Sequence, residues 1–386
     1  MPALLTNVFA RRRSSARLVL AGAAAIALWS ASSSAYAQAI IIPPVNVPNN
    51  PAPNNPPQSV FPGVTDMNSR LAATSALTDL GTNFLRRLGN HATWGYNTAV
   101  NSNPAGGGAS QATAPATFPV RAWGEAYGLT SRTGAQGTFV GDKRETAGGV
   151  AGFGATIAPN LSVGVWVDQS HTVIDVPLAS QSAKLDLTQV GVNASYTVGA
   201  WTLAAAGVHG FGNISAKRTT ALGFAGSGYN GHVDAALAEL SYYWAIGQGR
   251  VVPKASFEYL RAVTDSFSEY GGSNPVVAGA ATAERTRVLV GAEIGHYWIV
   301  DRRVIDISAY GKFVDNVRQN ISAVQVSLGT NTIAVQGVRE SRYGVDAGAS
   351  LSIGLTDALR MYLNYDGKFR NGFESHQGLL GFEVKW

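Results

Sequence analysis

The 386-residue sequence has no cysteine, few charges and, beyond its N-terminal region, no long apolar run. The lack of cysteine excludes a disulfide framework and thiolate metal sites. Only 14% of residues are charged, and no basic patch is interleaved with aromatics, so we expect no nucleic-acid partner. No apolar run of about eighteen residues follows residue 37, so no transmembrane helix is predicted there. Any membrane location must then depend on strands, whose hydropathy signal is weak per segment.

Recognisable catalytic motifs are also missing. The sequence has no P-loop and no H-E-x-x-H, and the nearest approach to G-x-S-x-G is residues 225–228, AGSG, without the first glycine. Asp168 with His171, and His232 with Asp234, could form acid–base pairs, but the favoured interpretation is that they are polar rim residues facing water. We therefore expect no enzyme and no catalytic, cofactor-binding or metal-binding residue.

The N-terminal region predicts export. Residues 1–37 combine four arginines between positions 11 and 17, an apolar run over 18–28 and an A-x-A site at Ala35-Tyr36-Ala37, which is typical of a cleaved signal peptide. Its removal lowers the net charge from +5 to +1, so the basic pI carries little information. Residues 38–65 are rich in proline and asparagine and predict a disordered cell-envelope linker.

Residues 66–90 predict one amphipathic helix. Leu77, Leu80, Phe84 and Leu88 fall on one stripe, and Gly89-Asn90 provides a stop signal. At a rise of 1.5 Å per residue the helix would be roughly 35 Å long, enough to cross a bilayer-sized barrel. The pattern leaves open whether it plugs a pore or lies outside. Residues 91–119 have low complexity and predict a flexible link.

From residue 120 to 386 the sequence alternates between apolar and polar positions in about twelve segments. The fold class predicted is all-β, a transmembrane antiparallel up-and-down β-barrel of about twelve strands preceded by the helix. Short turns alternate with longer connections, which fits short periplasmic turns and long external loops. The twelve predicted strands are 120–130, 146–158, 161–175, 184–198, 201–216, 231–246, 251–267, 285–300, 303–318, 340–355, 358–371 and 375–386.

Two sets of residues are assigned to the two faces of this wall. Aromatics near strand ends predict interface girdles, or alternatively a packed core: Trp123, Tyr196, Trp201, Trp244, Tyr297, Trp298, Tyr365 and Trp386. Charged residues predicted to face the lumen would pair with each other, contact a plug or tune ion selectivity, or would only keep the lumen polar. They are Glu125, Glu239, Glu258, Arg287, Glu293 and Asp346.

The last two segments carry a family resemblance. Residues 361–373, MYLNYDGKFRNGF, followed by the closing GFEVKW of 381–386, resemble the C-terminal translocator β-domain of the autotransporters, the type V secretion family, and the similarity extends over 120–386. Gly381, Phe382, Val384 and Trp386 resemble the assembly signal read by the barrel-assembly machinery. The polar residue expected two positions before the glycine is instead Leu379.

The resemblance implies a twelve-stranded barrel in the Gram-negative outer membrane, a helix in its pore and an N-terminal passenger delivered to the surface. It implies outer-membrane lipid, the barrel-assembly machinery and periplasmic chaperones as partners, and we expect a monomer without a cofactor. The sequence departs from the family in two respects. About 28 residues separate the cleavage site from the helix, so we expect little or no passenger, and the link to the first strand is long.

Some family members cut themselves at an Asn-Asn pair in the helix; the pairs here, at 49–50 and 54–55, precede it, so no such cleavage is expected. The favoured hypothesis is a translocator that anchors or displays a short N-terminal segment. The alternative is a passive porin-like channel or structural outer-membrane protein with a helix plug and a periplasmic tail.

Overall fold

The computed structural model describes residues 67–94, 120–301 and 303–386. The predicted signal peptide, the Pro/Asn-rich segment and most of the link before the first strand lie outside these residues. Within the three ranges, no helix is both long enough and apolar enough to cross a bilayer.

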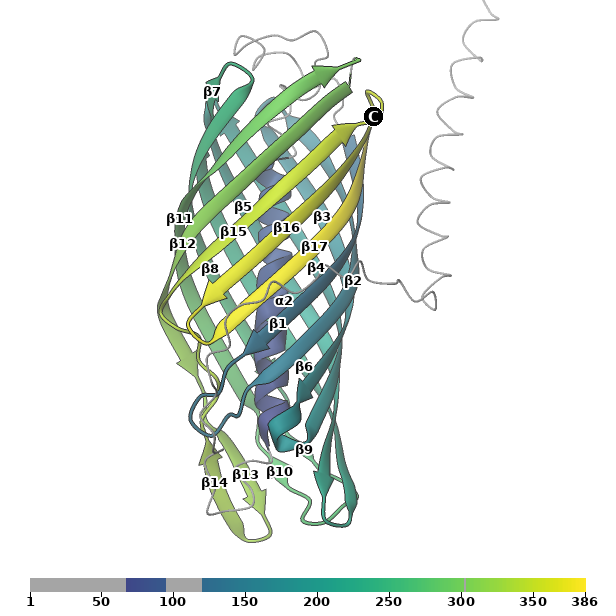
Figure 1. Ribbon diagram of the computed structural model, residues 1–386, viewed down its shortest axis with the longest axis vertical. Coiled ribbons are helices and arrows are strands. Elements are labelled where there is room, and N and C mark those ends of the chain that lie inside the picture. The colour runs from purple at the N-terminus through teal and green to yellow at the C-terminus, as the bar shows by residue number, and fades with distance from the viewer. Residues whose placement is uncertain (1–66, 95–119, 302) are drawn as a thin grey trace, which may run out of the picture. The chain divides into compact units, whose positions relative to one another are not determined.

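Twelve antiparallel strands of the described residues close into a barrel, which confirms the predicted fold class (Figure 1). Each strand pairs with the next in sequence, and β17 pairs with β1 to close the ring. The strands are β1 (Val120–Thr133), β2 (Asp142–Ala158), β3 (Leu161–Val176), β4 (Gln181–Val198), β5 (Trp201–Thr220), β6 (Gly223–Tyr242) with its continuation β7 (Trp244–Ile246), β8 (Gly249–Thr264), β11 (Ala281–Val300), β12 (Arg303–Ile321), β15 (Tyr343–Gly354), β16 (Leu359–Arg370) and β17 (Phe373–Lys385).

The two ends of the barrel differ. One end carries the short connections after β2, β4, β7, β11 and β15 together with Val120 and Trp386; we call it the turn end, and it is uppermost in Figure 1. The opposite end carries the long connections after β8 and β12, along with two-residue turns after β5 and β16; we call it the loop end. There β9 (Phe267–Ser268), β10 (Val277–Ala278), β13 (Val324–Leu328) and β14 (Asn331–Val335) form a separate small sheet, which the sequence did not predict.

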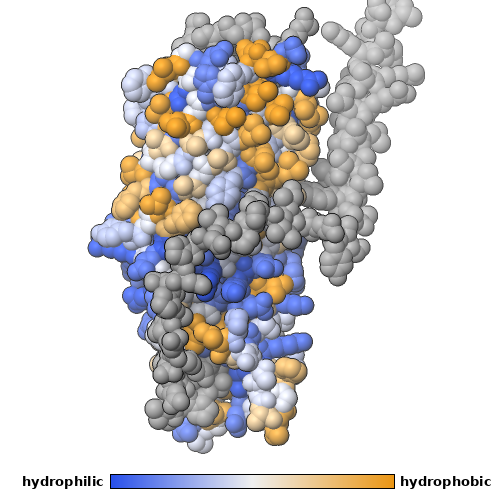
Figure 2. All heavy atoms as spheres, in the orientation of Figure 1, coloured by the Kyte–Doolittle hydropathy of each residue, from blue (hydrophilic) through white to orange (hydrophobic). Residues whose placement is uncertain are grey.

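Alternation along each strand sends successive side chains to opposite faces of the wall, as the pleat requires. On β15, Val345 is 48% exposed on the outside, whereas Asp346 is 1% exposed in the lumen. Outward apolar side chains gather around the turn end, and the loop end is mostly hydrophilic (Figure 2). A strand of twenty residues such as β5 spans roughly 50 Å along a tilted barrel, about twice the height of an apolar belt, so the strands continue beyond it.

Two sequence predictions about the wall are wrong. The segment 217–230 was expected to be a long loop, but β5 and β6 continue as a hairpin ladder to the pair Thr220–Gly223. Its outward positions mix polar residues such as Lys217 and Asn230 with Phe224, which is 68% exposed, so the regular alternation that marks the other strands is missing there. Trp123 was assigned to a girdle, but it faces the lumen and is 4% exposed; Tyr297 also has the inward register of β11.

One helix, α2 (Asn68–Trp94), lies inside the barrel, and Figure 1 shows it behind the front strands. It packs against β3, β4, β5, β6, β8 and β11. At about 40 Å it is longer than predicted, because Gly89-Asn90 does not end it. Gly89 instead lies against Leu237 of β6, where an added Cβ would be 3.1 Å from a leucine methyl group, so packing rather than capping accounts for this glycine.

Candidate functional site

The apolar stripe of α2 docks against an apolar half of the lumen wall. Leu77, Leu80, Phe84 and Leu88 are each at most 3% exposed. The inward positions of β4, β5, β6 and β8 that meet the helix include Leu185, Leu187, Val208, Val233, Leu237 and Leu260. Burial of such side chains is worth about 1.5–3 kcal/mol each, which accounts for the side of the lumen that the helix occupies.

Helix and wall approach closely because small residues interrupt both surfaces. An ideal Cβ on Gly81 would lie 2.6 Å from a methyl group of Val233 on β6. On the wall, an ideal Cβ on Gly191 of β4 would lie 2.4 Å from a methyl group of Leu88. Any larger side chain at these two positions would displace the helix from its seat.

The other side of the helix carries charges that pair with carboxylates and arginines around the barrel. Asp79 accepts a hydrogen bond from Arg144 of β2 at 2.7 Å. Arg86 forms ion pairs with Glu258 of β8, at 2.6 Å, and with Asp346 of β15. Because these partners stand on widely separated strands, the pairs locate the helix within the lumen and fix its rotation.

A second helical arginine extends this network. Arg87 lies 3.2 Å from Glu125 of β1 and 3.7 Å from Asp168 of β3. Its guanidinium also sits 4.2 Å from the ring centroid of Tyr127, a cation–π contact. Buried ion pairs add little net stability, but removal of one member is costly, so they act mainly to specify the position of the helix.

An aromatic cluster holds the C-terminal part of α2. The imidazole of His91 contacts Glu125 at 2.5 Å, and its ring centroid lies 4.5 Å from that of Trp166 and 5.3 Å from that of Trp123. The hydroxyl of Tyr362 donates to the same carboxylate at 2.6 Å. This cluster places the end of the helix towards the turn end of the barrel.

The N-terminal turn of α2 is held by loop-end residues. Arg70 donates to the carbonyl of Gly279 at 2.6 Å, and its guanidinium lies 4.9 Å from the ring centroid of Phe267. The amide of Ser69 donates to Gln181 at 2.8 Å. The helix therefore enters the lumen at the loop end and runs towards the turn end.

The six charges predicted to face the lumen all do so, each at most 7% exposed. Four of them meet the helix: Glu125, Glu258 and Asp346 through the contacts above, and Arg287 by donating to Thr82 at 2.9 Å. Glu239 instead pairs with Lys312 at 2.9 Å, and Glu293 pairs with Lys254 at 2.9 Å, both within the wall. Which of them act in function stays a prediction.

Sequence reasoning missed the helical partners of these charges, namely Asp79, Arg86, Arg87 and His91. It weighed only the apolar stripe of the helix. The available signal was the adjacent pair Arg86-Arg87 outside that stripe, which a helix lying in a polar lumen would place against carboxylates.

The residues of the predicted assembly signal lie at the seam of the barrel. Trp386 exchanges backbone hydrogen bonds with Val120, at 3.1 and 3.2 Å. Phe382 and Val384 face outwards, whereas Gly381 faces inwards against the ring of Tyr362. Leu379, at the position where a polar residue was expected, is buried in the lumen at 3% exposure. Their role in assembly stays a prediction.

The two acid–base pairs considered from the sequence do not form. Asp168 points into the lumen and His171 points outwards, because they are an odd number of residues apart on one strand. His171 instead contacts Asp186 at 2.6 Å, and Asp234 contacts His209 at 2.7 Å, all on the outer surface. Within residues 67–94, 120–301 and 303–386, no group of three or more metal-ligating side chains occurs.

Comparisons with known proteins agree with this architecture. Residues 122–366 match the family model described as the autotransporter beta-domain. The chain is similar to the translocator domain of autotransporter NalP from Neisseria meningitidis, with a TM-score of 0.63 and 15% identity over 83% of this chain and 99% of that one. It is also similar to the beta domain of the Bordetella autotransporter BrkA, with a TM-score of 0.53 and 15% identity over 69% and 100%. No curated protein matches the sequence.

Proposed function

The chain belongs to the autotransporter β-domain family, and from this membership we propose that its helix-filled barrel holds a short N-terminal segment at the cell surface. The barrel is an outer-membrane translocator, and the family does not favour the porin-like alternative. The belt of outward apolar side chains at the turn end is the surface that meets lipid.

The direction of α2 carries the proposal. Asn68 contacts loop-end residues, since its side-chain oxygen accepts from the amide of Val140 at 2.9 Å, whereas His91 lies among the strands nearer the turn end. Short turns of such barrels face the periplasm and longer loops face outwards. The N-terminal end of the helix at Asn68 therefore lies at the outer side, and its other end is directed towards the periplasmic side, where β1 begins at Val120.

The ion pairs of Asp79, Arg86 and Arg87 support the role of anchor. They tie the helix to β1, β2, β3, β8 and β15, so a pull on the N-terminal segment is resisted by the whole barrel. We further propose export by a cleaved signal peptide, assembly by the barrel-assembly machinery with periplasmic chaperones, and a monomer without enzymatic activity.

Epitope accessibility tests the proposed topology. One full-length variant carries a tag between Gln58 and Ser59, and a matched control carries it in the turn-end connection between Gln248 and Gly249. On intact cells, antibody and protease should reach the first tag but not the second, and permeabilisation should expose both. Protection of the first tag in intact cells would contradict surface display and favour a periplasmic tail.

A further inference from the structure

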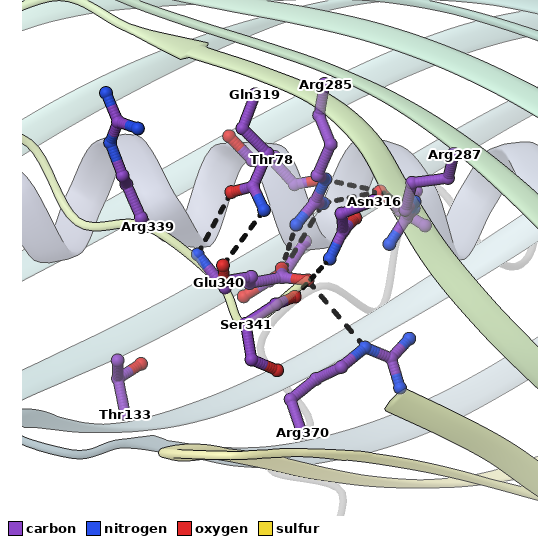
Figure 3. Close-up of polar contacts among 12 residues, drawn as sticks. Thr78, Thr133, Arg285, Arg287, Asn316, Gln319, Arg339, Glu340, Ser341 and Arg370 are labelled. Atoms are coloured by element: carbon purple, nitrogen blue, oxygen red, sulfur yellow. Dashed lines mark hydrogen bonds and ion pairs between the residues drawn. The ribbon is translucent and has the colours of Figure 1, made fainter. Parts of the chain in front are cut away.

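The connection between β14 and β15, residues 336–342, reaches across the loop end of the lumen; we call it the strap. Within the strap, Glu340 has a side chain that is only 12% exposed. Figure 3 shows the Glu340 carboxylate among side chains that come from β11, β12 and β16. The strap therefore directs a charged group inwards.

The strap lies over the part of the lumen that α2 leaves unfilled. The helix packs against β3, β4, β5, β6, β8 and β11, and a cavity of about 200 Å³ separates it from the strap. The cavity is lined on the helix side by Thr74, Ser75 and Thr78, and on the other side by strap residues 337–340. The helix and the strap thus cover different parts of the lumen opening at the loop end.

Side-chain amides hold the backbone of the strap on two sides. Gln319 of β12 donates to the carbonyl of Glu340 at 2.9 Å and accepts from its amide at 3.1 Å. From the connection between β1 and β2, Gln136 donates to the carbonyl of Arg339 at 3.1 Å and accepts from its amide at 2.7 Å. Such contacts can be released without breaking the ladder of any barrel strand.

The Glu340 carboxylate forms ion pairs with two arginines that come from different strands of the barrel. One partner is Arg285 of β11; the other is Arg370 of β16, at 3.9 Å. Arg285 also donates to Thr82 of the helix at 3.2 Å and lies 3.9 Å from Asp79. One arginine therefore contacts both the seated helix and the strap, which couples their positions.

We propose that the strap is a latch that seals the part of the lumen beside the docked helix. The Glu340 carboxylate, held by its two arginines, blocks the passage. Release of this carboxylate leaves Arg86, Arg285, Arg287, Lys368 and Arg370 beside three carboxylates, those of Asp79, Glu258 and Asp346, so positive charge is in excess there. Rings of arginine and lysine favour anions, so the resulting leak should be selective for small inorganic anions such as chloride. The latch rests on the proposed translocator function, because a lumen wide enough for a polypeptide has to be closed once the helix is in place.

Conductance of the full-length protein in planar lipid bilayers tests the latch. Glu340→Gln should raise the conductance at least about threefold and move the reversal potential in a potassium chloride gradient towards that of chloride. Glu145→Gln, which removes an equal charge from an exposed outward position on β2, should leave both values unchanged. Conductance and selectivity of Glu340→Gln equal to those of the unmodified protein would overturn the proposal.

A second set of variants covers the case that Glu340→Gln fails to fold. Gln319→Ala frees the strap without changing its charge and should also raise conductance. Because the chain has no cysteine, Gln136→Cys with Arg339→Cys provides a unique pair of thiols for a short cross-linker. Cross-linking in the Glu340→Gln or Gln319→Ala background should restore the unmodified conductance, and a leak that persists would place the passage elsewhere. Failure of the tag experiment affects display alone, so the two outcomes can be told apart.

Discussion

Replacement of Gly81 by alanine has opposite consequences for a helix packed in the barrel and for a helix outside it. In an exposed helix the change stabilises by about 1 kcal/mol, because glycine is the poorer helix former. In the lumen the new Cβ would lie 2.6 Å from a methyl group of Val233 and 3.2 Å from one of Leu260. Overpacking of this kind costs about 1–3 kcal/mol, so we expect a net loss of up to about 2 kcal/mol.

A double-mutant cycle with Val233→Ala isolates this contact. Removal of the valine methyl groups makes room for the new Cβ, so Gly81→Ala should become neutral or stabilising in that background. The coupling free energy should be about 1–3 kcal/mol, the size of the relieved overpacking. The four proteins would be compared by guanidinium unfolding in detergent micelles, followed through tryptophan emission.

The result that would refute this reasoning is additivity. If Gly81→Ala stabilises the protein equally in both backgrounds, within about 0.5 kcal/mol, then Gly81 and Val233 do not meet. The helix would then lie elsewhere than against β6, and the anchor proposed for the N-terminal segment would lose its basis. Far-ultraviolet circular dichroism of each variant checks that the helix itself is retained.

The remaining predictions concern the ion pairs and the closing strand. Arg87→Met leaves the buried carboxylate of Glu125 without its arginine and should cost about 3–5 kcal/mol in the same unfolding assay, whereas Arg132→Met, at an exposed outward position, should change stability by less than about 0.5 kcal/mol. Trp386→Ala should reduce the yield of folded barrel in the outer membrane several-fold, measured by heat-modifiable mobility on gels. Trp201→Ala, another half-exposed outward tryptophan, is the control; equal yields for the two variants would argue against a terminal assembly signal.

The barrel was predictable from the sequence because its signal is local. Pleating forces neighbouring residues onto opposite faces, so the alternation of Val345 and Asp346 is enough to assign one to lipid and the other to the lumen. The same rule placed the six lumen charges. It failed over 217–230, where the ladder continues through a mixture of polar and apolar outward residues such as Lys217 and Phe224. It also gave no sign of the small loop-end sheet, whose strands are two to five residues long.

The end of the helix was predicted wrongly because the prediction used a local signal and did not consider what the helix packs against. Gly89-Asn90 is a stop signal where solvent can hydrate the last carbonyl groups. Inside the lumen, Gly89 provides space for Leu237, and the helix continues to Trp94. Tertiary packing therefore overrides a local propensity that is worth about 1 kcal/mol.

The sequence by itself determined the strand-rich architecture, the two faces of each strand and the presence of one amphipathic helix, because these depend on periods of two and 3.6 residues. Only the tertiary structure decided where that helix lies and which charges it meets. Arg86 and Asp346 are 260 residues apart, and Arg87 and Glu125 belong to different elements. Closure of the ring brings such residues together. A local sequence pattern shows that a side chain points inwards but does not show which residue it contacts there. The direction of the helix, on which the proposed surface display depends, follows from the contacts of Asn68 at the loop end and of His91 nearer the turn end.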